Sequence, residues 1–398
     1  MIFNNIKLKN MKNIKFIALY ALFLLGVSAP AQVDFTAICE TGQTLDYTIL
    51  SENPPEVEIY HTEDYSGSLI IPASVSYNGT DYSVVSIGRG AFMGGSCTNF
   101  TGTLSIPNTV RSIGEQAFHG CTFTGPLVIP NSVTEIGSHA FMDCINFTSL
   151  TLSESLSIIE EFTFGVCTGF RGDLFIPESV YDVKYNAFYQ CGFDGTLTLS
   201  PMMWYLQEGS FELCSNFTSV VIPEGVGYLD WNAMDFLVKP TELEIPSTME
   251  CMLDYAFCHL NRLTTMSVKA TVPPYIEENT FQQVNRNIPV HIPQGTIENY
   301  RNAEYWCEFT NFIETEFVSL NECEPSAKIA VYPNPALNFV RIEGTTVEGL
   351  QVFNAAGQLV KTVQNTNEIN ISDLERGIYF VSIVTENREH FVRKIVKN

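Results

Sequence analysis

The feature that most constrains the fold of this chain is a phrase that recurs every 23 or 24 residues. Residues 106–121 read IPNTVRSIGEQAFHGC, and residues 129–144 repeat the pattern as IPNSVTEIGSHAFMDC. A proline or a substitute for it marks each copy, at Pro72, Pro107, Pro130, Ser153, Pro177, Ser200, Pro223, Pro246, Lys269 and Pro293. Periods of about 20 to 29 residues with leucine-type positions are typical of a solenoid in which every repeat forms one coil.

Apolar residues on both sides of the proline predict the local structure of each coil. Leu127 and Ile129 stand three and one residues before Pro130, and the same two positions are apolar in the other coils. This alternation indicates a short strand, and strands that recur once per coil lie parallel, about 4.7 to 4.9 Å apart. Proline then ends the strand because it lacks an amide donor. A second apolar pair, such as Val133 and Ile136, is followed by glycine and predicts a turn.

Eleven residues after the proline, an aromatic residue recurs and predicts a buried column. Its members are Phe118, Phe141, Phe164, Phe188, Phe211 and Phe257, with Met234 once, and Phe281 and Tyr305 one residue later. Each buried aromatic ring removes about 150 to 250 Å² from water, so this column is expected to be a main source of stability.

Five of the eleven cysteines stand three residues after the aromatic: Cys121, Cys144, Cys167, Cys191 and Cys214. Leucine or valine takes this position in later coils, so we interpret these cysteines as small buried apolar residues. A metal ladder or a series of disulfides is disfavoured, because thiols one coil apart do not converge as metal ligands do and are poorly aimed for bridging. One or two pairs among the other six cysteines are open to bridging in an oxidising compartment: Cys39, Cys97, Cys251, Cys258, Cys307 and Cys323.

The amino terminus predicts export. Residues 1–31 carry four lysines and no acidic residue, an apolar run at 16–29, and the small-x-small sequence Ala29-Pro30-Ala31. This pattern is typical of a secretory signal peptide cleaved after Ala31. The run of 14 residues is too short to span about 30 Å of hydrocarbon.

The charge excludes several classes of partner. The formal net charge is −23, and residues 32–327 hold 37 of the 44 acidic residues but only 9 of the 21 basic ones. A surface this acidic repels phosphate backbones and anionic lipids, so nucleic-acid binding and polybasic membrane association are not expected.

The recurring phrase IPxSVxxIGxxAFxxC resembles the leucine-rich repeat of BspA-like bacterial surface proteins over about residues 85–315. The resemblance implies a right-handed solenoid of the β-rich α/β class, with a parallel sheet on its concave face. Residues 32–84 are similar to the β-rich amino-terminal cap of these proteins. The last repeat, residues 290–314, resembles their closing unit, in which an amphipathic helix bearing Ile297, Tyr300, Ala303 or Glu304, and Trp306 would cover the open end.

The carboxy terminus carries a second, independent resemblance. Short alternating strands separated by turns resemble the type A C-terminal sorting domain of the type IX secretion system in Bacteroidota, a small β-sandwich, over residues 328–398. The resemblance implies export across the outer membrane by the type IX machinery, removal of the domain near residues 315–328, and a linker at 316–327. The alternative is an ordinary β-sandwich that serves as a binding module. The implied sorting signal comprises Tyr332, Pro333, Asn334, Pro335, Gly377, Tyr379, Lys394 and Lys397.

Catalytic motifs are not apparent in the sequence, and neither an enzyme activity nor a cofactor or metal is expected. The histidines are scattered, and His119 and His139 are predicted to face solvent beside the aromatic column. Asn-Phe-Thr triplets at Asn99, Asn146 and Asn216 share one repeat position, so we interpret them as repeat geometry rather than glycosylation sites.

Function is therefore expected on the solvent-facing side of the strands that precede the proline, on the concave face of the solenoid. Phe175 between Val128 and Val221 would form an apolar patch, which on a solvent-facing sheet is typical of protein binding. The predicted ligand-binding residues are Val128, Thr151, Phe175, Thr198, Val221 and Glu244.

The leading hypothesis is a secreted or surface-attached, non-catalytic, monomeric recognition protein for an extracellular or host protein, which meets the membrane only through surface attachment. A passive structural or spacer component of the cell surface is the alternative. An enzyme acting on glycans or peptides is a third class.

Overall fold

The computed structural model describes residues 33–62, 66–93, 99–317, 330–332, 336, 338–343, 346–354, 359–374, 377–385 and 390–397. The chain divides into two compact units, Met1–Glu316 and Phe317–Asn398. The expected signal peptide lies outside the described residues. Within the described residues, every helix is too short or too polar to cross a membrane.

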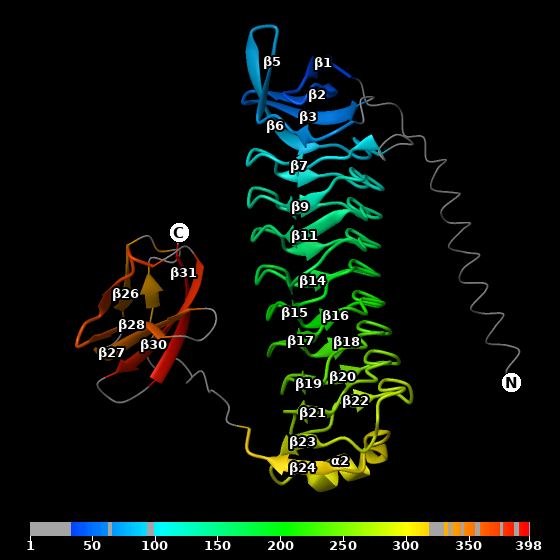
Figure 1. Cartoon of the computed structure of the whole chain (residues 1–398), viewed down its shortest axis with the longest axis vertical. Helices are drawn as coiled ribbons and strands as arrows, with labels where there is room; N and C mark the ends of the chain where they lie inside the picture. Colours follow the sequence, from blue (N-terminus) through cyan, green and yellow to red (C-terminus); the bar gives the residue numbers. More distant parts are fainter. Residues whose placement is uncertain are drawn as a thin grey trace, which may run out of the picture. The chain divides into compact units, whose positions relative to one another are not determined.

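The first unit is a solenoid whose coils stack along its long axis (Figure 1). Each coil contributes one strand at the position predicted before the proline, and neighbouring strands pair in parallel, as Leu127 with Leu150 and Leu197 with Val220. We call this set the first strand column. The predicted solenoid of parallel strands is confirmed. The first strand column comprises β4 (Leu69–Ile70), β7 (Leu104–Ser105), β9 (Gly125–Val128), β11 (Phe147–Thr151), β13 (Leu174–Phe175), β15 (Thr196–Thr198), β17 (Ser219–Val221), β19 (Glu242–Ile245), β21 (Thr265–Val268), β23 (Val290–Pro293) and β24 (Phe312–Thr315).

A second column of parallel strands runs through the same coils, where the sequence indicated only an apolar pair and a turn. From Ser112 onward each coil supplies two residues, of which the second is buried, as Val183 and Leu206 are. Two residues are too few for an alternation to be seen, which is why the pattern did not predict strands here. The second strand column comprises β3 (Pro55–Thr62), β6 (Thr80–Ile87), β8 (Ser112–Ile113), β10 (Glu135–Ile136), β12 (Ile158–Ile159), β14 (Asp182–Val183), β16 (Tyr205–Leu206), β18 (Tyr228–Leu229), β20 (Cys251–Met252) and β22 (Tyr275–Ile276).

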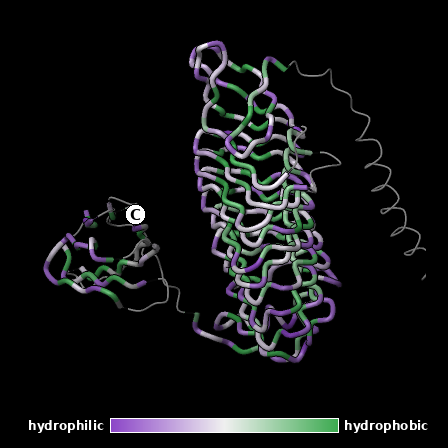
Figure 2. The backbone as a smooth tube through the Cα atoms, turned by 45° about the horizontal axis from the view of Figure 1, so that its top comes forward, coloured by the Kyte–Doolittle hydropathy of each residue, from purple (hydrophilic) through white to green (hydrophobic). Residues whose placement is uncertain are grey.

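Two stacks of phenylalanine rings fill the interior between these columns. The predicted stack extends one coil further towards the amino terminus, to Phe92, and its rings lie nearly parallel with centroids 5.0 to 5.6 Å apart through Phe211. A second stack was not predicted and explains the Asn-Phe-Thr triplets, because their phenylalanines are buried in it. Its members are Phe100, Phe123, Phe147, Phe170, Phe193 and Phe217. Figure 2 shows hydrophobic and hydrophilic stretches alternating along the coils, as this interior requires.

The five repeated cysteines are buried, as predicted, and they also make a hydrogen bond that was not predicted. Each thiol donates to the carbonyl oxygen of the stacked phenylalanine in the preceding coil, for example Cys167 Sγ to Phe141 O at 3.1 Å and Cys214 Sγ to Phe188 O at 3.0 Å. Burial raises the pKa of the Cys167 and Cys191 thiols far above the ordinary value, so both stay protonated and able to donate.

The amino-terminal cap adds three strands to the coil edge: β1 (Phe35–Ile38), β2 (Thr44–Glu52) and β5 (Ser74–Tyr77). Strand β3 pairs with β2 in antiparallel and with β6 in parallel, and β6 pairs in parallel with β8 of the next coil. The β-rich cap therefore continues directly into the second strand column.

The closing unit differs in detail from the prediction. Helix α2 (Ile297–Asn302) has only six residues, because Ala303 is extended and Tyr305 has a positive φ of 60°. Trp306 lies in the following 3₁₀ helix η2 (Trp306–Glu308) and is buried against Phe281, so it takes the place in the aromatic column that was predicted for Tyr305. Tyr300 and Trp306 fix the cap by donating hydrogen bonds to carbonyl oxygens of the last coils, Ala270 O at 2.7 Å and Pro274 O at 2.8 Å.

Among its described residues, the second unit contains two antiparallel sheets whose buried side chains form one cluster around Val340, Leu350 and Val381. One sheet has the order β25-β26-β29 and the other the order β28-β27-β30-β31. The strands are β25 (Ala330–Tyr332), β26 (Phe339–Glu343), β27 (Val347–Asn354), β28 (Leu359–Gln364), β29 (Glu368–Asn370), β30 (Gly377–Thr385) and β31 (His390–Lys397).

Candidate functional site

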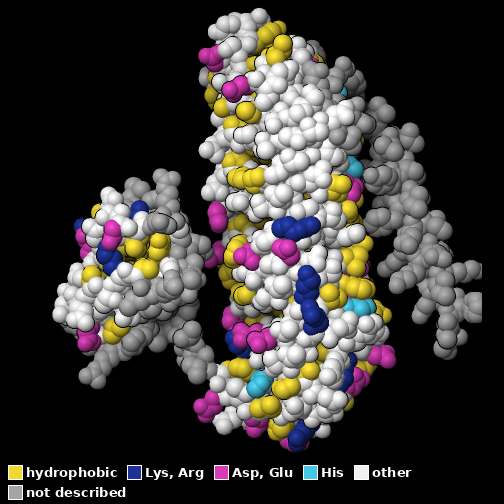
Figure 3. All heavy atoms as spheres, viewed as in Figure 1, with side chains coloured by type: hydrophobic (Ala, Val, Ile, Leu, Met, Phe, Trp, Pro, Cys, Tyr) yellow, Lys and Arg dark blue, Asp and Glu magenta, His cyan; other side chains and the backbone are white. Residues whose placement is uncertain are grey.

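The predicted ligand-binding residues stand in one row on the outer face of the first strand column. Three large apolar side chains of this row are exposed: Phe175 by 62%, Val128 by 51% and Val221 by 46%. Thr151 and Glu244 are exposed, and Thr198 is half-buried. Hydrophobic side chains reach the solenoid surface among polar ones in the view of Figure 3.

The register of the strands brings part of this row into direct contact. Phe175 on β13 is the partner of Thr198 on β15, which in turn is the partner of Val221 on β17. Val128 and Thr151 are partners on β9 and β11. Each buried neighbour, such as Leu174 or Leu197, points to the interior because side chains alternate along a strand. The sheet therefore presents the Phe175 ring and the Val221 side chain to solvent, with Thr198 between them.

An ion pair and a polar contact lie at the end of the row nearer the closing unit. Glu244 Oε1 lies 2.6 Å from Lys269 Nζ, the residue that replaces the repeat proline in its coil. His291 Nδ1 lies 2.9 Å from Thr315 Oγ1 on β24. At the opposite end, Thr103, Ser105, Pro126 and Val128 line a shallow depression.

Two residues of the implied sorting signal, Gly377 and Lys397, lie side by side in the second unit. Gly377 on β30 is the register partner of Lys397 on β31, and Ala336 forms an isolated bridge with the same Lys397. Lys397 and Tyr379 are buried, whereas Tyr332 is exposed. Lys394 lies on β31 opposite Phe380. Pro333, Asn334 and Pro335 lie outside the described residues.

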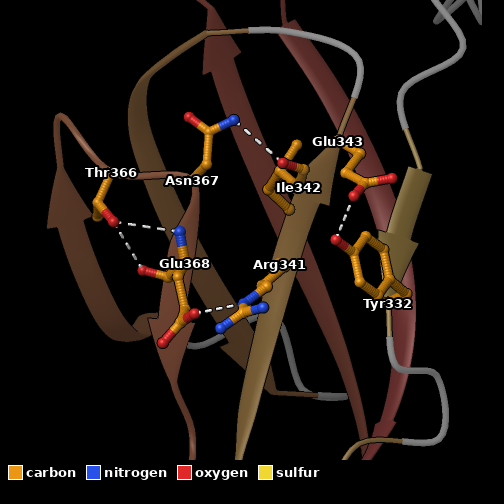
Figure 4. Close-up of polar contacts among 7 residues, drawn as sticks. All are labelled: Tyr332, Arg341, Ile342, Glu343, Thr366, Asn367 and Glu368. Atoms are coloured by element: carbon orange, nitrogen blue, oxygen red, sulfur yellow. Dashed lines mark hydrogen bonds and ion pairs between the residues drawn. The ribbon is translucent and has the colours of Figure 1, made fainter.

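Polar contacts tie the smaller sheet of this unit together (Figure 4). The Tyr332 hydroxyl donates to the Glu343 carboxylate across β25 and β26, and Arg341 pairs with Glu368 across β26 and β29. Asn367 donates to the Ile342 carbonyl oxygen at 3.0 Å. Tyr332, the first residue of the implied signal, is thus held on the sheet by a side-chain partner.

One group of described residues has the chemistry of a metal site. Asp235, Cys258 and His259 each place one ligand atom within 4.8 Å of the others, and a zinc-type ion accepts such a set. The Asp235 carboxylate already accepts hydrogen bonds from the Phe236 amide at 2.7 Å and from His259 Nδ1 at 2.9 Å. Burial and then the Asp235 charge raise the pKa of Cys258 to about 12, so its thiol is protonated. As it stands, the group is a hydrogen-bonded cluster in the coil wall.

The free cysteines bear on the disulfides that the sequence left open. Cys39, Cys251, Cys258 and Cys307 are free thiols in the structure. Cys97 and Cys323 lie outside the described residues.

The prediction that His119 and His139 face solvent is wrong, because both are half-buried. Both histidines contact side chains of the next coil beside the aromatic stack. The His139 ring stacks on the Phe162 ring with centroids 5.2 Å apart, and His119 Nε2 lies 3.7 Å from Asp143 Oδ2. Burial lowers the pKa of both imidazoles.

The outer face of the second strand column is a candidate surface that the sequence pattern did not predict. Tyr205, Tyr228 and Tyr275 occupy the outward position of β16, β18 and β22. The signal was present in the sequence, because these tyrosines all stand immediately before the buried residue of the strand. Alternation of apolar residues indicates only the strand before the proline, so this face does not follow from the pattern.

Stacked coils with one short parallel strand before each proline define a leucine-rich repeat solenoid. Residues 85–200 and 195–310 match the family model described as BspA type leucine rich repeat region, in six copies. The chain belongs to this BspA-type leucine-rich repeat family. Residues 330–398 match the secretion system C-terminal sorting domain. The protein therefore carries a type IX sorting tail, which indicates that it is secreted or displayed on the cell surface.

Several solved structures are similar to this chain. A leucine-rich repeat protein of Treponema pallidum is 25% identical, with a TM-score of 0.41, over 47% of this chain and 83% of that one. A leucine-rich cell surface protein of Faecalibacterium prausnitzii is 17% identical, with a TM-score of 0.44, over 72% and 96%. The pneumococcal vaccine antigen PcpA is 13% identical, with a TM-score of 0.31, over 72% and 100%. None of the curated proteins compared with the chain matches it.

Proposed function

We propose that this protein is a non-catalytic recognition protein that binds an extracellular or host protein through the outer face of the first strand column. The sorting tail supports a location where such ligands are met, and the repeat family supports a scaffold that presents a long surface. The ligand-binding residues in this proposal are Val128, Thr151, Phe175, Thr198, Val221 and Glu244.

The observation that carries the proposal is the exposure of Phe175. The Phe175 side chain is 62% exposed. Covering an apolar ring with a partner removes it from water, which favours binding. Val221, two strands away in register, extends the same apolar surface, and the hydroxyl of Thr198 lies between them. Such a ring with polar neighbours is typical of the centre of a protein-binding patch.

The experiment is a binding screen of the full chain against immobilised extracellular proteins, followed by substitution of Phe175→Asp together with Val221→Asp. We expect loss of the captured partner, because two charges would be buried without partners at the interface. Ile145→Asp is the matched control, since Ile145 is exposed to the same extent as Val221 but lies outside this row. Equal binding by all three proteins, or no partner at all, would support the structural or spacer role instead.

We also propose that the second unit directs export and that a signal peptide is removed near Ala31. The register pairing of Gly377 with Lys397, two residues of the implied sorting signal, supports this proposal because it brings two parts of the signal that are distant in sequence together. In a bacterium with a type IX system, deletion of residues 328–398 is expected to leave the protein in the periplasm. Amino-terminal sequencing of the exported protein tests the cleavage position, and sedimentation tests the proposed monomer.

A further inference from the structure

Four of five consecutive coils carry large aromatic side chains on the outer face of the second strand column, and the coil of β20 has Cys251 at this position. Tyr275, Tyr181, Trp204 and Trp231 are exposed by 58%, 53%, 49% and 49%, and Tyr205 by 36%. The same segment of the three preceding coils, residues 111–115, 134–138 and 157–161, contains no aromatic residue. The repeat itself therefore does not require these rings. We call this surface the aromatic face, and it comprises Tyr181, Trp204, Tyr205, Tyr228, Trp231 and Tyr275.

The register places these residues close together. Tyr205 is the partner of Tyr228, Tyr228 of Cys251, and Cys251 of Tyr275. At about 4.8 Å between strands, the face extends roughly 15 Å from the first of these tyrosines to the last. The rings of Tyr205 and Tyr228 touch, with centroids 5.2 Å apart. The face is long enough for four or so residues of an extended peptide at about 3.4 Å each.

Contacts hold the rings of the aromatic face in place. The indole of Trp204 lies against Gly227 of the next coil, where an added Cβ atom would come within 2.4 Å of the ring. Trp231 Nε1 donates to Glu277 Oε2 at 3.3 Å, and the Tyr205 hydroxyl donates to Asp230. Rings fixed in this way lose little conformational entropy when a ligand covers them.

The charge of the aromatic face selects the class of ligand. Residues 181–184, 204–208, 227–231, 250–254 and 274–278 contain seven carboxylates and one cation, Lys184, which lies 2.7 Å from Asp182. Burial raises the pKa of the Tyr228 phenol to about 12, so it adds no charge of its own at neutral pH. Tryptophan and tyrosine rings attract cations through their faces, and carboxylates beside them add Coulomb attraction. A neutral glycan would use the rings but would gain nothing from the net charge.

We propose that the aromatic face binds a lysine- or arginine-rich segment of another protein. This site lies on the second strand column and is independent of the proposed site on the first. Basic side chains would lie over the rings of Trp204 and Trp231, with their charges near Asp230 and Glu277. The excess of acidic groups favours encounter with a basic segment and opposes acidic or phosphorylated ones.

Tryptophan fluorescence reports directly on this proposal. The chain has three tryptophans, of which Trp204 and Trp231 lie on the aromatic face and Trp306 is 1% exposed. Titration of the full chain with a decalysine peptide is expected to change the emission saturably, and the affinity should fall as salt is added. A deca-glutamate peptide should give no response. Saturation by a neutral hexasaccharide such as cellohexaose, without a response to decalysine, would overturn the proposal in favour of glycan binding.

Calorimetry on variants separates this site from general attraction to an acidic protein. Trp204→Ala together with Trp231→Ala keeps every carboxylate, and we expect at least a tenfold loss of decalysine affinity. Asp230→Asn with Glu277→Gln should weaken binding in the same way, while Phe175→Ala on the first strand column should leave it unchanged. Circular dichroism verifies that each variant is folded. Unchanged affinity in the folded double tryptophan variant would show that decalysine binds elsewhere and would refute the proposal.

Discussion

The amino-terminal coils, residues 92–217, and the carboxy-terminal coils, residues 226–281, are built on one period but differ in their interior. The earlier coils contain two unbroken phenylalanine stacks and five buried thiols. In the later coils Met234 interrupts one stack, and Leu237 and Leu260 replace the thiols. The exposed aromatic rings of the second strand column follow a different division, because Tyr181, Trp204 and Tyr205 belong to the earlier coils and only Trp231 and Tyr275 to the later ones. The period therefore fixes backbone geometry, while interior packing and surface chemistry vary independently along it.

The largest expected loss of stability comes from breaking a phenylalanine stack of the earlier coils. Phe141→Ala removes a fully buried ring stacked on both sides, at 5.1 Å from Phe118 and 5.6 Å from Phe164, and should lower the free energy of unfolding by about 3 to 5 kcal/mol. Met234→Ala, in the later coils, is the matched comparison. It should cost less, because the side chain is smaller and no ring stack is broken. Urea titration followed by circular dichroism measures both, and equal costs would show that stacking adds nothing to burial.

A second test concerns the close approach of Trp204 to Gly227. Gly227→Ala places a methyl group where the indole lies, so the ring must move, at a cost of about 1 to 3 kcal/mol. Near-ultraviolet circular dichroism should register the displaced ring. Gly295→Ala is a useful contrast, because nothing lies within 4 Å of its added Cβ atom and its cost comes only from its positive φ of 80°. An unchanged near-ultraviolet spectrum in Gly227→Ala would contradict the described packing.

A smaller effect separates the two roles of the repeated cysteines. Cys167→Val keeps an apolar side chain but loses the hydrogen bond to Phe141 O, at a cost of about 1 kcal/mol. The cost is limited because the Phe141 carbonyl still accepts the Cys144 amide at 3.3 Å. Cys167→Ser is the complementary variant, because its hydroxyl can still donate to Phe141 O but is less apolar than the thiol. If valine proves as stable as cysteine, the thiol acts only as an apolar side chain, as the sequence first indicated.

The smallest effect is expected to stabilise the protein. Val166 adopts a positive φ of 63°, which is strained for a β-branched residue, and Gly120 and Asp143 occupy the same position in earlier coils. Val166→Asn should raise the free energy of unfolding by about 1 kcal/mol, because asparagine tolerates this conformation. A shift of the thermal midpoint measures it. A lower midpoint would mean that the packing of the valine outweighs its backbone strain.

The sequence predicted the coil, its first strand, its aromatic stack and its buried thiols. Each of these features depends on one type of residue that recurs at one position of the repeat. The second phenylalanine stack was equally periodic, yet Phe100, Phe147 and Phe217 were considered only as members of glycosylation-like triplets. The second strand column could not be recognised by alternation, because a strand of two residues has only one buried position.

Surface properties were harder to predict than the interior. Exposure of Phe175 followed from strand alternation, whereas the partners of Trp231 and Tyr205 lie in neighbouring coils and depend on side-chain rotamers. The half-buried state of His119 and His139 depends in the same way on residues one coil away. The end of α2 at Asn302 reflects the extended Ala303, for which the sequence gives no capping signal.

The continuity of the amino-terminal cap with the second strand column has a consequence for how the molecule is assembled. Each pairing from β3 to β6, β8 and β10 offers a finished edge to the segment that is synthesised next. A chain that emerges amino terminus first can thus add coils one at a time onto a completed template, without waiting for distant residues. The same logic allows evolution to lengthen or shorten the molecule by whole coils, in steps of roughly 5 Å, while both caps stay the same.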